Sequence, residues 1–272
     1  MTEYTDRSAQ ALLREENLSQ LEKYALLAVG SRSLLGLLYS EMAIGLWGGS
    51  AGAFGYFIRQ KAYRRLFKAA GQKPVIGKNV TIRGSRNITL GNNVFIDDQC
   101  VLDARGPRAA ITIEDGCFIS RNTIIRTRNG EIVIGREAVI GCNCLLGTDS
   151  RLHVGAEAML AAYVCIVGGK QHRFDDPEVP IIRQQGFRPS RGGVEIGPGA
   201  WLGVRTTVLD GVVIGKGTVV GAHSLVNRSL PEMSVAFGSP ARVRSRRGES
   251  PGGGAPGEHG IAAGPPTGGE DA

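Results

Sequence analysis

The sequence predicts an all-β solenoid, a parallel β-helix of about seven coils, with a helical N-terminal segment and a disordered C-terminal tail. An aliphatic residue recurs every six positions through most of residues 75–244, and a small or β-branched residue follows four positions after it. Glycine is abundant, at 40 of 272 residues, but has no three-residue period. The glycines therefore indicate turns rather than a collagen helix.

The six-residue phase is clearest between residues 196 and 230. The aliphatic positions are Ile196, Leu202, Val208, Ile214, Val220 and Val226, and the residues four positions later are Ala200, Thr206, Val212, Thr218, Ser224 and Leu230. Each unit is expected to form one short strand and a corner, so that three units close a triangular coil of 18 residues. Glycine beside the aliphatic residue is expected to permit a corner with positive φ. A β-sandwich would instead alternate with a period of two.

Composition divides the chain into four regions. Residues 1–24 are polar, and residues 25–74 are apolar and then basic and are expected to be helical. Residues 75–244 carry the repeat, with one large insertion at 168–193. Residues 245–272 are rich in glycine and proline. The last region has little to bury, which predicts disorder.

Charge and cysteine content limit the class of protein. The net charge of +7 suggests an anionic partner. Nucleic acid is not expected, because the basic residues lie beside apolar segments or near the end of the repeat, without a groove-reading motif. Five cysteines without a secreted-domain pattern, and no signal peptide, indicate a reduced cytoplasmic location.

The apolar N-terminal segment has two interpretations. Residues 33–58 contain one charge, Glu41, and glycines at 48–52 predict a break in any helix there. Five basic residues follow directly: Arg59, Lys61, Arg64, Arg65 and Lys68. Residues 33–68 therefore suit a peripheral anchor on the anionic cytoplasmic face of a membrane, or a helical cap over the first coil.

The most specific block of sequence runs from Val194 to Val226, contains the corner Trp201-Leu202-Gly203, and is followed by Phe237-Gly-Ser-Pro-Ala-Arg-Val243. In this block the chain resembles the hexapeptide-repeat acyltransferases of the left-handed parallel β-helix type, specifically the maltose, galactoside and colanic acid O-acetyltransferases. The resemblance implies a left-handed coil and a homotrimer with active sites between subunits. It also implies acetyl-CoA as acyl donor and a sugar hydroxyl as acceptor, in surface polysaccharide or lipid-linked glycan biosynthesis.

The insertion carries the expected catalytic base. Transfer of an acyl group from a thioester to a hydroxyl needs a base with a pKa near 7, which histidine supplies. His172 lies in the insertion, and the resemblance assigns it this role. Asp175 or Asp176 is expected to orient its imidazole. Backbone N–H groups near Gly203 and Val204 resemble the oxyanion site of the family.

The resemblance also implies contacts with coenzyme A and with the acceptor. The expected coenzyme A contacts are Trp201, Gly203, Val204, Ala222, Asn227, Arg228, Arg242 and Arg244. The arginines would meet the phosphates. Asn227 and Val204 depart from the usual Thr and from the usual Ser or Ala, so a Val204 contact would use its backbone. Asp149, in the coil before the insertion, is the candidate for binding the acceptor.

A metal site is not expected. Cys142 and Cys144 form a Cys-x-Cys pair that could bind zinc. However, Cys100, Cys117 and Cys144 fall on the position four after an aliphatic residue, where small side chains pack inside. Carbonic anhydrases of the same helical fold use a pair of histidines five residues apart, which this sequence lacks. Two further alternatives are N-acetylation of an amino sugar and a non-catalytic trimeric scaffold.

Overall fold

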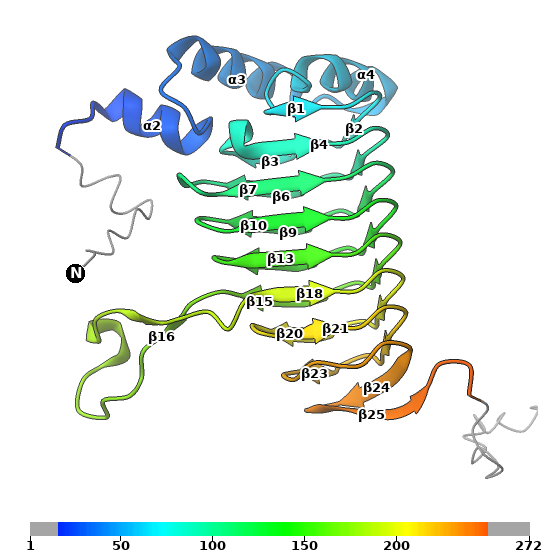
Figure 1. Ribbon diagram of the computed structural model, residues 1–272. Helices are drawn as coiled ribbons and strands as arrows, with labels where there is room; N and C mark the ends of the chain where they lie inside the picture. The colour runs from blue at the N-terminus through cyan, green and yellow to red at the C-terminus, as the bar shows by residue number, and fades with distance from the viewer. Residues whose placement is uncertain (1–15, 250–272) are drawn as a thin grey trace, which may run out of the picture.

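The computed structural model describes residues 16–249, which form a three-sided parallel β-solenoid with helices at its N-terminal end (Figure 1). The expected fold class is confirmed. Within these residues, seven coils each give one strand to each of three sheets, and an eighth coil begins. Residues 1–15 and most of the predicted disordered tail, residues 250–272, lie outside the described part.

Equivalent strands of successive coils pair in order along the axis. The first sheet contains β1 (Ala69–Ala70), β4 (Ile88–Leu90), β7 (Ala110–Ile113), β10 (Glu131–Ile134), β13 (Arg151–Val154), β18 (Val194–Ile196) and β21 (Val213–Ile214). The second contains β2 (Val75–Ile76), β5 (Phe95–Ile96), β8 (Phe118–Ile119), β11 (Val139–Ile140), β14 (Met159–Leu160), β19 (Trp201–Leu202), β22 (Val219–Val220), β24 (Ser234–Gly238) and β25 (Ala241–Arg246). The third contains β3 (Thr81–Arg83), β6 (Val101–Ala104), β9 (Ile124–Thr127), β12 (Leu145–Thr148), β15 (Cys165–Gly168), β20 (Thr207–Leu209) and β23 (Leu225–Val226).

The core is a set of aliphatic columns that run along the axis of the prism. In the second sheet, Ile96, Ile119 and Ile140 occupy the same register position of successive coils, and each is 0% exposed. The residues four positions later, such as Cys100 and Thr123, are also buried. The six-residue phase therefore separates inward from outward side chains as expected. Each buried aliphatic side chain contributes about 1.5–3 kcal/mol.

The corners differ from the expectation. The residue with positive φ is the third after the inward aliphatic, as at Asn79 (φ 57°) and Asn143 (φ 57°), and asparagine tolerates this conformation well. Glycine beside the aliphatic residue has another purpose. A Cβ at Gly155 would lie 2.5 Å from the backbone nitrogen of Pro198 in the next coil. These glycines are needed because neighbouring coils approach closely, not because φ is positive.

We expect Gly155→Ala to lower the free energy of unfolding by about 1–3 kcal/mol, since backbone must move to admit the methyl group. Gly45→Ala is the matched control. Gly45 lies in a helix, and a Cβ there would meet nothing within 4 Å. This control is expected to gain about 0.5–1 kcal/mol from helix propensity. Urea unfolding curves measure both changes, and equal stability of the two variants would contradict the close-approach explanation.

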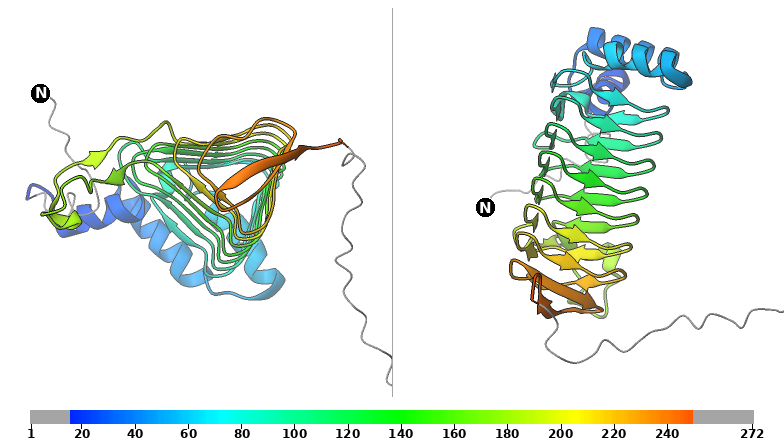
Figure 2. Two further views of the ribbon diagram at one scale, coloured as in Figure 1. Left: turned by 90° about the horizontal axis from the view of Figure 1, so that it is seen from below. Right: turned by 90° about the vertical axis from the view of Figure 1, so that its right-hand side faces the viewer.

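Three helices occupy the N-terminal end: α2 (Gln20–Ala28), α3 (Leu34–Trp47) and α4 (Gly52–Tyr63). A capping box formed by Ser19 and Glu22 starts α2, and the Ser33 hydroxyl accepts from the N–H of Gly36 at the start of α3. The predicted break falls between α3 and α4. Helices α3 and α4 lie across the end of the prism in Figure 2. Tyr63, at the end of α4, is buried in the solenoid core.

The helices cover the first coil, as the cap interpretation requires. No helix within residues 16–249 has both the length and the apolar character needed to cross a bilayer. The first strand, β1, precedes the expected start of the repeat at residue 75, and β25 extends past residue 244. At this C-terminal end β25 folds back antiparallel on β24.

Arg59 is not one of the exposed basic residues that the sequence suggested. Its side chain is 1% exposed. Its Nε donates to the carbonyl of Ile76 at 2.8 Å, and its Nη1 donates to the carbonyls of Trp47 at 3.1 Å and Ser50 at 2.6 Å. The guanidinium therefore joins the end of α3 to the first coil. Its charge is satisfied by carbonyl oxygens, so that Arg59 is unavailable to a membrane.

Candidate active site

The insertion projects from one corner of the prism as a long loop (Figures 1 and 2). Two short antiparallel strands, β16 (Gln171–His172) and β17 (Phe187–Arg188), join its two arms. His172 pairs with Phe187, and the two rings are 5.2 Å apart. The His172 side chain is exposed. The loop thus holds an imidazole outside the coils, where a substrate can reach it.

Asp175 interacts with arginines of the same loop. Its carboxylate accepts from Arg188 and from Nε of Arg173 at 3.0 Å, and these bonds lower the pKa of Asp175 below its usual value. The guanidinium of Arg188 also lies 3.9 Å from the centre of the Phe174 ring. Asp175 therefore stays ionised into the acidic range, and its partners are the arginines that brace the hairpin.

Asp176 is also engaged within the loop. Its carboxylate accepts from the N–H of Glu178 at 2.9 Å, and its carbonyl accepts from Nε2 of Gln184 at 2.8 Å. Within residues 16–249, neither Asp175 nor Asp176 is hydrogen-bonded to His172. The predicted orienting aspartate is not in place in the single chain, where the imidazole lies beside the ring of Phe187.

The expected coenzyme A residues lie elsewhere on the solenoid. Trp201 is 49% exposed on the outward face of the second sheet, in register with Val219 of the next coil and close to β24. Asn227 and Arg228 are exposed after β23, and Arg242 and Arg244 are exposed on β25. Arg242 and Arg244 are in the same sheet as Trp201, whereas Asn227 and Arg228 lie at the corner between the third and first sheets. These exposed cations near the C-terminal end of the prism suit a phosphorylated ligand.

Of the backbone N–H groups of Gly203 and Val204, expected to bind an oxyanion, one is already hydrogen-bonded within the solenoid. The N–H of Gly203 donates to the carbonyl of Val220 at 2.8 Å, so it is already used in the ladder between coils. Within residues 16–249, the N–H of Val204 donates no hydrogen bond. The carbonyl of Val204 accepts from the N–H of His223 at 2.8 Å. Ala222 lies beside Gly203, since a Cβ on the glycine would come within 2.6 Å of its nitrogen. Of the two N–H groups, that of Val204 is therefore the better candidate for an oxyanion donor.

His172 and Trp201 are not brought together in one chain. The loop leaves from β15 of the third sheet and returns to β18 of the first, so it emerges at the corner between those sheets. Trp201 lies on the second sheet, which is the opposite side of the triangle. Asp149, by contrast, lies at the base of the loop beside Gly169.

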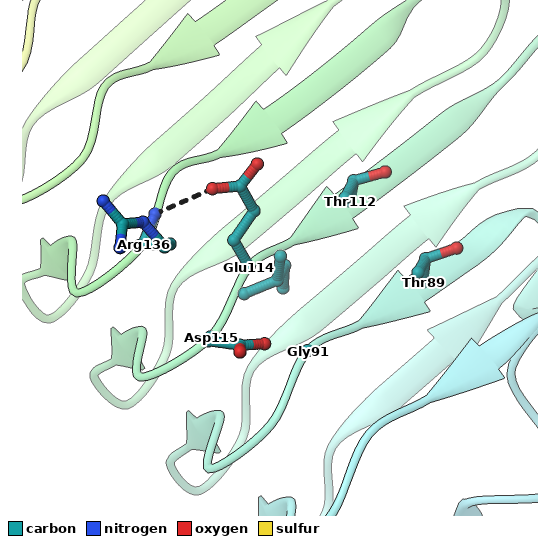
Figure 3. Close-up of a pocket in the computed structure, with 7 residues that line it drawn as sticks. Thr89, Gly91, Thr112, Glu114, Asp115 and Arg136 are labelled. Atoms are coloured by element: carbon teal, nitrogen blue, oxygen red, sulfur yellow. Dashed lines mark hydrogen bonds between the residues drawn. The ribbon is translucent and has the colours of Figure 1, made fainter.

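Sequence reasoning missed a polar cluster at the base of the loop. Asp210 lies there, 7% exposed, with Ser150 and Ser190. The available signal was the pair of double glycines, 168–169 and 192–193, that bracket the insertion. A surface pocket lies apart from all these residues, on the first sheet (Figure 3). There the carboxylate of Glu114 accepts from the N–H of Arg136, and Asp115 accepts from Asn92.

Three of the five cysteines pack in the interior, as expected. Cys100, Cys117 and Cys144 are at most 1% exposed, and burial raises the pKa of each thiol to about 11. Cys142 and Cys165 are half-buried. Among residues 16–249, no group of three or more His, Cys, Asp or Glu side chains is arranged to hold a metal ion.

We expect Ellman's reagent at pH 8 to modify at most the two half-buried thiols of the native protein. Thiols with a pKa near 11 are protonated at pH 8, and the thiolate is the reactive species. All five should react in 6 M guanidinium chloride, which provides the control. Rapid modification of three or more native thiols would contradict the interior assignment.

Comparison with known proteins defines the family. The family model described as "Bacterial transferase hexapeptide (six repeats)" matches residues 193–228. The chain is 32% identical to the probable acetyltransferase Rv3034c of Mycobacterium tuberculosis over 57% of this chain and 50% of that protein. It is 31% identical to the galactoside O-acetyltransferase of Lactococcus lactis, over 51% of this chain and 64% of that protein.

A third relative is the putative colanic acid biosynthesis acetyltransferase WcaF of Escherichia coli, at 32% identity over 50% of this chain and 72% of that protein. The match thus spans half of the mycobacterial relative but most of the E. coli one. The chain belongs to the hexapeptide-repeat acetyltransferases. The family expected from the Trp201 corner and the closing Gly-Ser-Pro-Ala-Arg block is confirmed.

Proposed function

We propose that this protein is an acetyl-CoA-dependent O-acetyltransferase that modifies a sugar hydroxyl, in the synthesis of a surface polysaccharide or a lipid-linked glycan. The observation that carries the proposal is the exposed imidazole of His172 on a braced loop. The other two described histidines belong to the coils. His153 pairs in register within β13, and His223 forms a corner with φ of 56°.

The residues of the chain suit direct transfer. His172 takes the proton of the acceptor hydroxyl as that oxygen attacks the thioester carbonyl, and it then gives the proton to the departing thiolate. The Val204 N–H is the candidate donor to the oxyanion. Trp201 would flank the pantetheine arm, and Arg228 and Arg242 would meet the phosphates of coenzyme A. The products are an acetyl ester and free coenzyme A. An amino sugar would use the same proton transfers.

We propose that the active enzyme is a homotrimer, with His172 of one subunit facing Trp201 of its neighbour. The two residues lie on opposite sides of one prism, so a site that uses both needs two copies. The outward faces of two sheets also carry apolar side chains that suit subunit contact. These are Phe95, Phe118, Val139 and Met159 on the second sheet, and Val101, Ile124, Leu145 and Val167 on the third. The rings of Phe95 and Phe118 are stacked 4.6 Å apart.

We expect His172→Ala to lower kcat by about 10²–10⁴-fold, because the general base is lost. Thiol release from acetyl-CoA is measured with galactosides, maltose, nucleotide sugars and a lipid-linked glycan as acceptors. The matched control is His153→Ala, which removes a half-buried imidazole on the first sheet and should keep normal turnover.

Both variants should keep the wild-type dissociation constant for acetyl-CoA and the trimer mass in sedimentation equilibrium. Near-normal kcat of His172→Ala would remove the histidine from the mechanism. Failure of the wild type to bind acetyl-CoA would favour a non-catalytic scaffold. A monomer that is fully active would contradict the shared site.

We also propose that the helical cap contacts an anionic membrane surface. The faces of α3 and α4 that point away from the prism expose large apolar side chains: Leu35 (82%), Leu38 (59%), Met42 (53%), Leu46 (61%), Phe54 (66%) and Phe57 (58%). The one acidic residue there, Glu41, accepts from the hydroxyl of Tyr24 at 2.8 Å. Lys61, Arg64, Arg65 and Lys68 are exposed beside this face. Apolar surface with a basic margin suits phospholipid with anionic headgroups.

The double variant Leu38→Glu/Phe57→Glu is expected to lose at least about tenfold in affinity for phosphatidylglycerol vesicles, since it adds charge and removes apolar area. Co-sedimentation of the full chain measures binding. Val213→Glu is the control, because Val213 is 46% exposed on the first sheet. Equal binding of wild type and double variant, or a double variant that alters only the trimer mass, would overturn the membrane assignment.

A further inference from the structure

The loop that carries His172 joins the solenoid at its two ends, Gly169 and Gly193, which together we call the neck. Its first residue, Gly169, has φ of 107°, and a Cβ there would lie 2.7 Å from the nitrogen of Asp149. Its last residue, Gly193, has φ of 88°, and a Cβ there would collide with the carbonyl oxygen of Arg151. Both ends of the loop therefore press against the same stretch of the preceding coil. Only glycine fits at these two points.

Asp210, from the following coil, lies between the two ends. It comes directly after β20 and is 7% exposed. Its Oδ1 accepts from the N–H of Gly169 at 2.7 Å, and its Oδ2 accepts from the N–H of Arg191 at 2.5 Å. The hydroxyl of Ser190 lies 2.9 Å from Oδ1 and 3.1 Å from Oδ2. One carboxylate thus binds the first residue of the loop and two residues near its end.

Further hydrogen bonds complete the neck. Ser190 Oγ lies 3.0 Å from Oγ of Ser150, and it accepts from the N–H of Gly192 at 3.2 Å. The N–H of Gly211 donates to the carbonyl of Gly193 at 2.6 Å. The neck is thus fixed to the coil before it and to the coil after it. Hydrogen bonds to a charged acceptor are the stronger kind, and shelter from water strengthens them.

We propose that Asp210 is the positioning residue for His172: its carboxylate closes the neck and so sets the direction in which the loop leaves the prism. The role in turnover rests on the proposed function of His172, whereas the closure of the neck does not. His172 follows Gly169 by only three residues in the chain. A change in the backbone position at the neck therefore also displaces the imidazole. A displacement of about 1 Å in a reacting group can cost about 10²-fold in rate.

The principal test is Asp210→Asn in the full chain. The amide keeps the size of the side chain but offers one acceptor oxygen and turns an NH₂ group toward N–H donors. We expect trypsin to cleave within residues 170–191 about tenfold faster, because cleavage at the exposed Arg173 and Arg183 requires local opening of the loop, which a weaker neck makes more frequent. We expect kcat to fall about 30-fold while KM for acetyl-CoA changes less than about twofold.

Asp98→Asn is the matched control. Its carboxylate also accepts a backbone N–H from a neighbouring coil, that of Lys78 at 2.6 Å, but at the N-terminal end of the solenoid. It should leave both loop cleavage and kcat unchanged. Ser190→Ala is the milder second variant, which keeps the proposal testable if Asp210→Asn unfolds. Ser190→Ala should change loop cleavage and kcat less than Asp210→Asn does. The double variant Asp210→Asn/Ser190→Ala should change each quantity by less than the product of the two single fold-changes.

The outcomes separate the two claims. Unchanged loop cleavage in both Asp210→Asn and Ser190→Ala overturns the closed neck. Faster cleavage with unchanged kcat overturns the positioning role if His172→Ala is inactive. Normal turnover of His172→Ala removes the catalytic histidine, and the cleavage rates then still decide whether Asp210 closes the neck.

Discussion

The close stacking of one coil on the next is the constraint on which the whole structure depends. Parallel strands pair in register along three sheets, so each inward residue meets its counterpart in the adjacent coil. The spacing between paired strands, about 4.8 Å, brings the corners of neighbouring coils close together. Glycine at positions such as Gly155 and Gly203 follows from that spacing. The same close approach recurs at the neck of the loop, at Gly169 and Gly193.

This rigid stack keeps His172 and Trp201, two residues of the proposed site, on different sides of the molecule. The loop can carry His172 outward only from the corner where the coil is interrupted, and Trp201 is fixed on the second sheet. Neither can move toward the other without breaking paired strands. In the proposed trimer a second copy would join them, and the apolar outward columns supply area for that contact.

Most of the solenoid could be predicted because its signal is local. Every sixth residue points inward by backbone geometry alone, so the columns and the buried Cys100, Cys117 and Cys144 follow from spacing. The position of His172 on an insertion also followed from the interrupted phase. The partners of Asp175 could not be predicted, because Arg188 reaches it only through the pairing of β16 with β17.

Arg59 and Asp210 were beyond sequence reasoning for a similar reason. A basic residue after an apolar segment and an acidic residue at a corner are typical of exposed positions. Each is buried because backbone groups from distant segments converge on it. Arg59 meets the carbonyls that end α3, and Asp210 meets the N–H groups at the neck.

The antiparallel return of β25 also determines how long the molecule can be. A parallel stack presents open strand edges at its ends, on which the first coil of another copy would continue the ladder into a fibre. At one end β25 runs opposite to every strand of the coils and carries Arg242, Arg244 and Arg246. At the other end α3 and α4 lie over the first coil. Both features oppose continuation of the strand ladder along the axis.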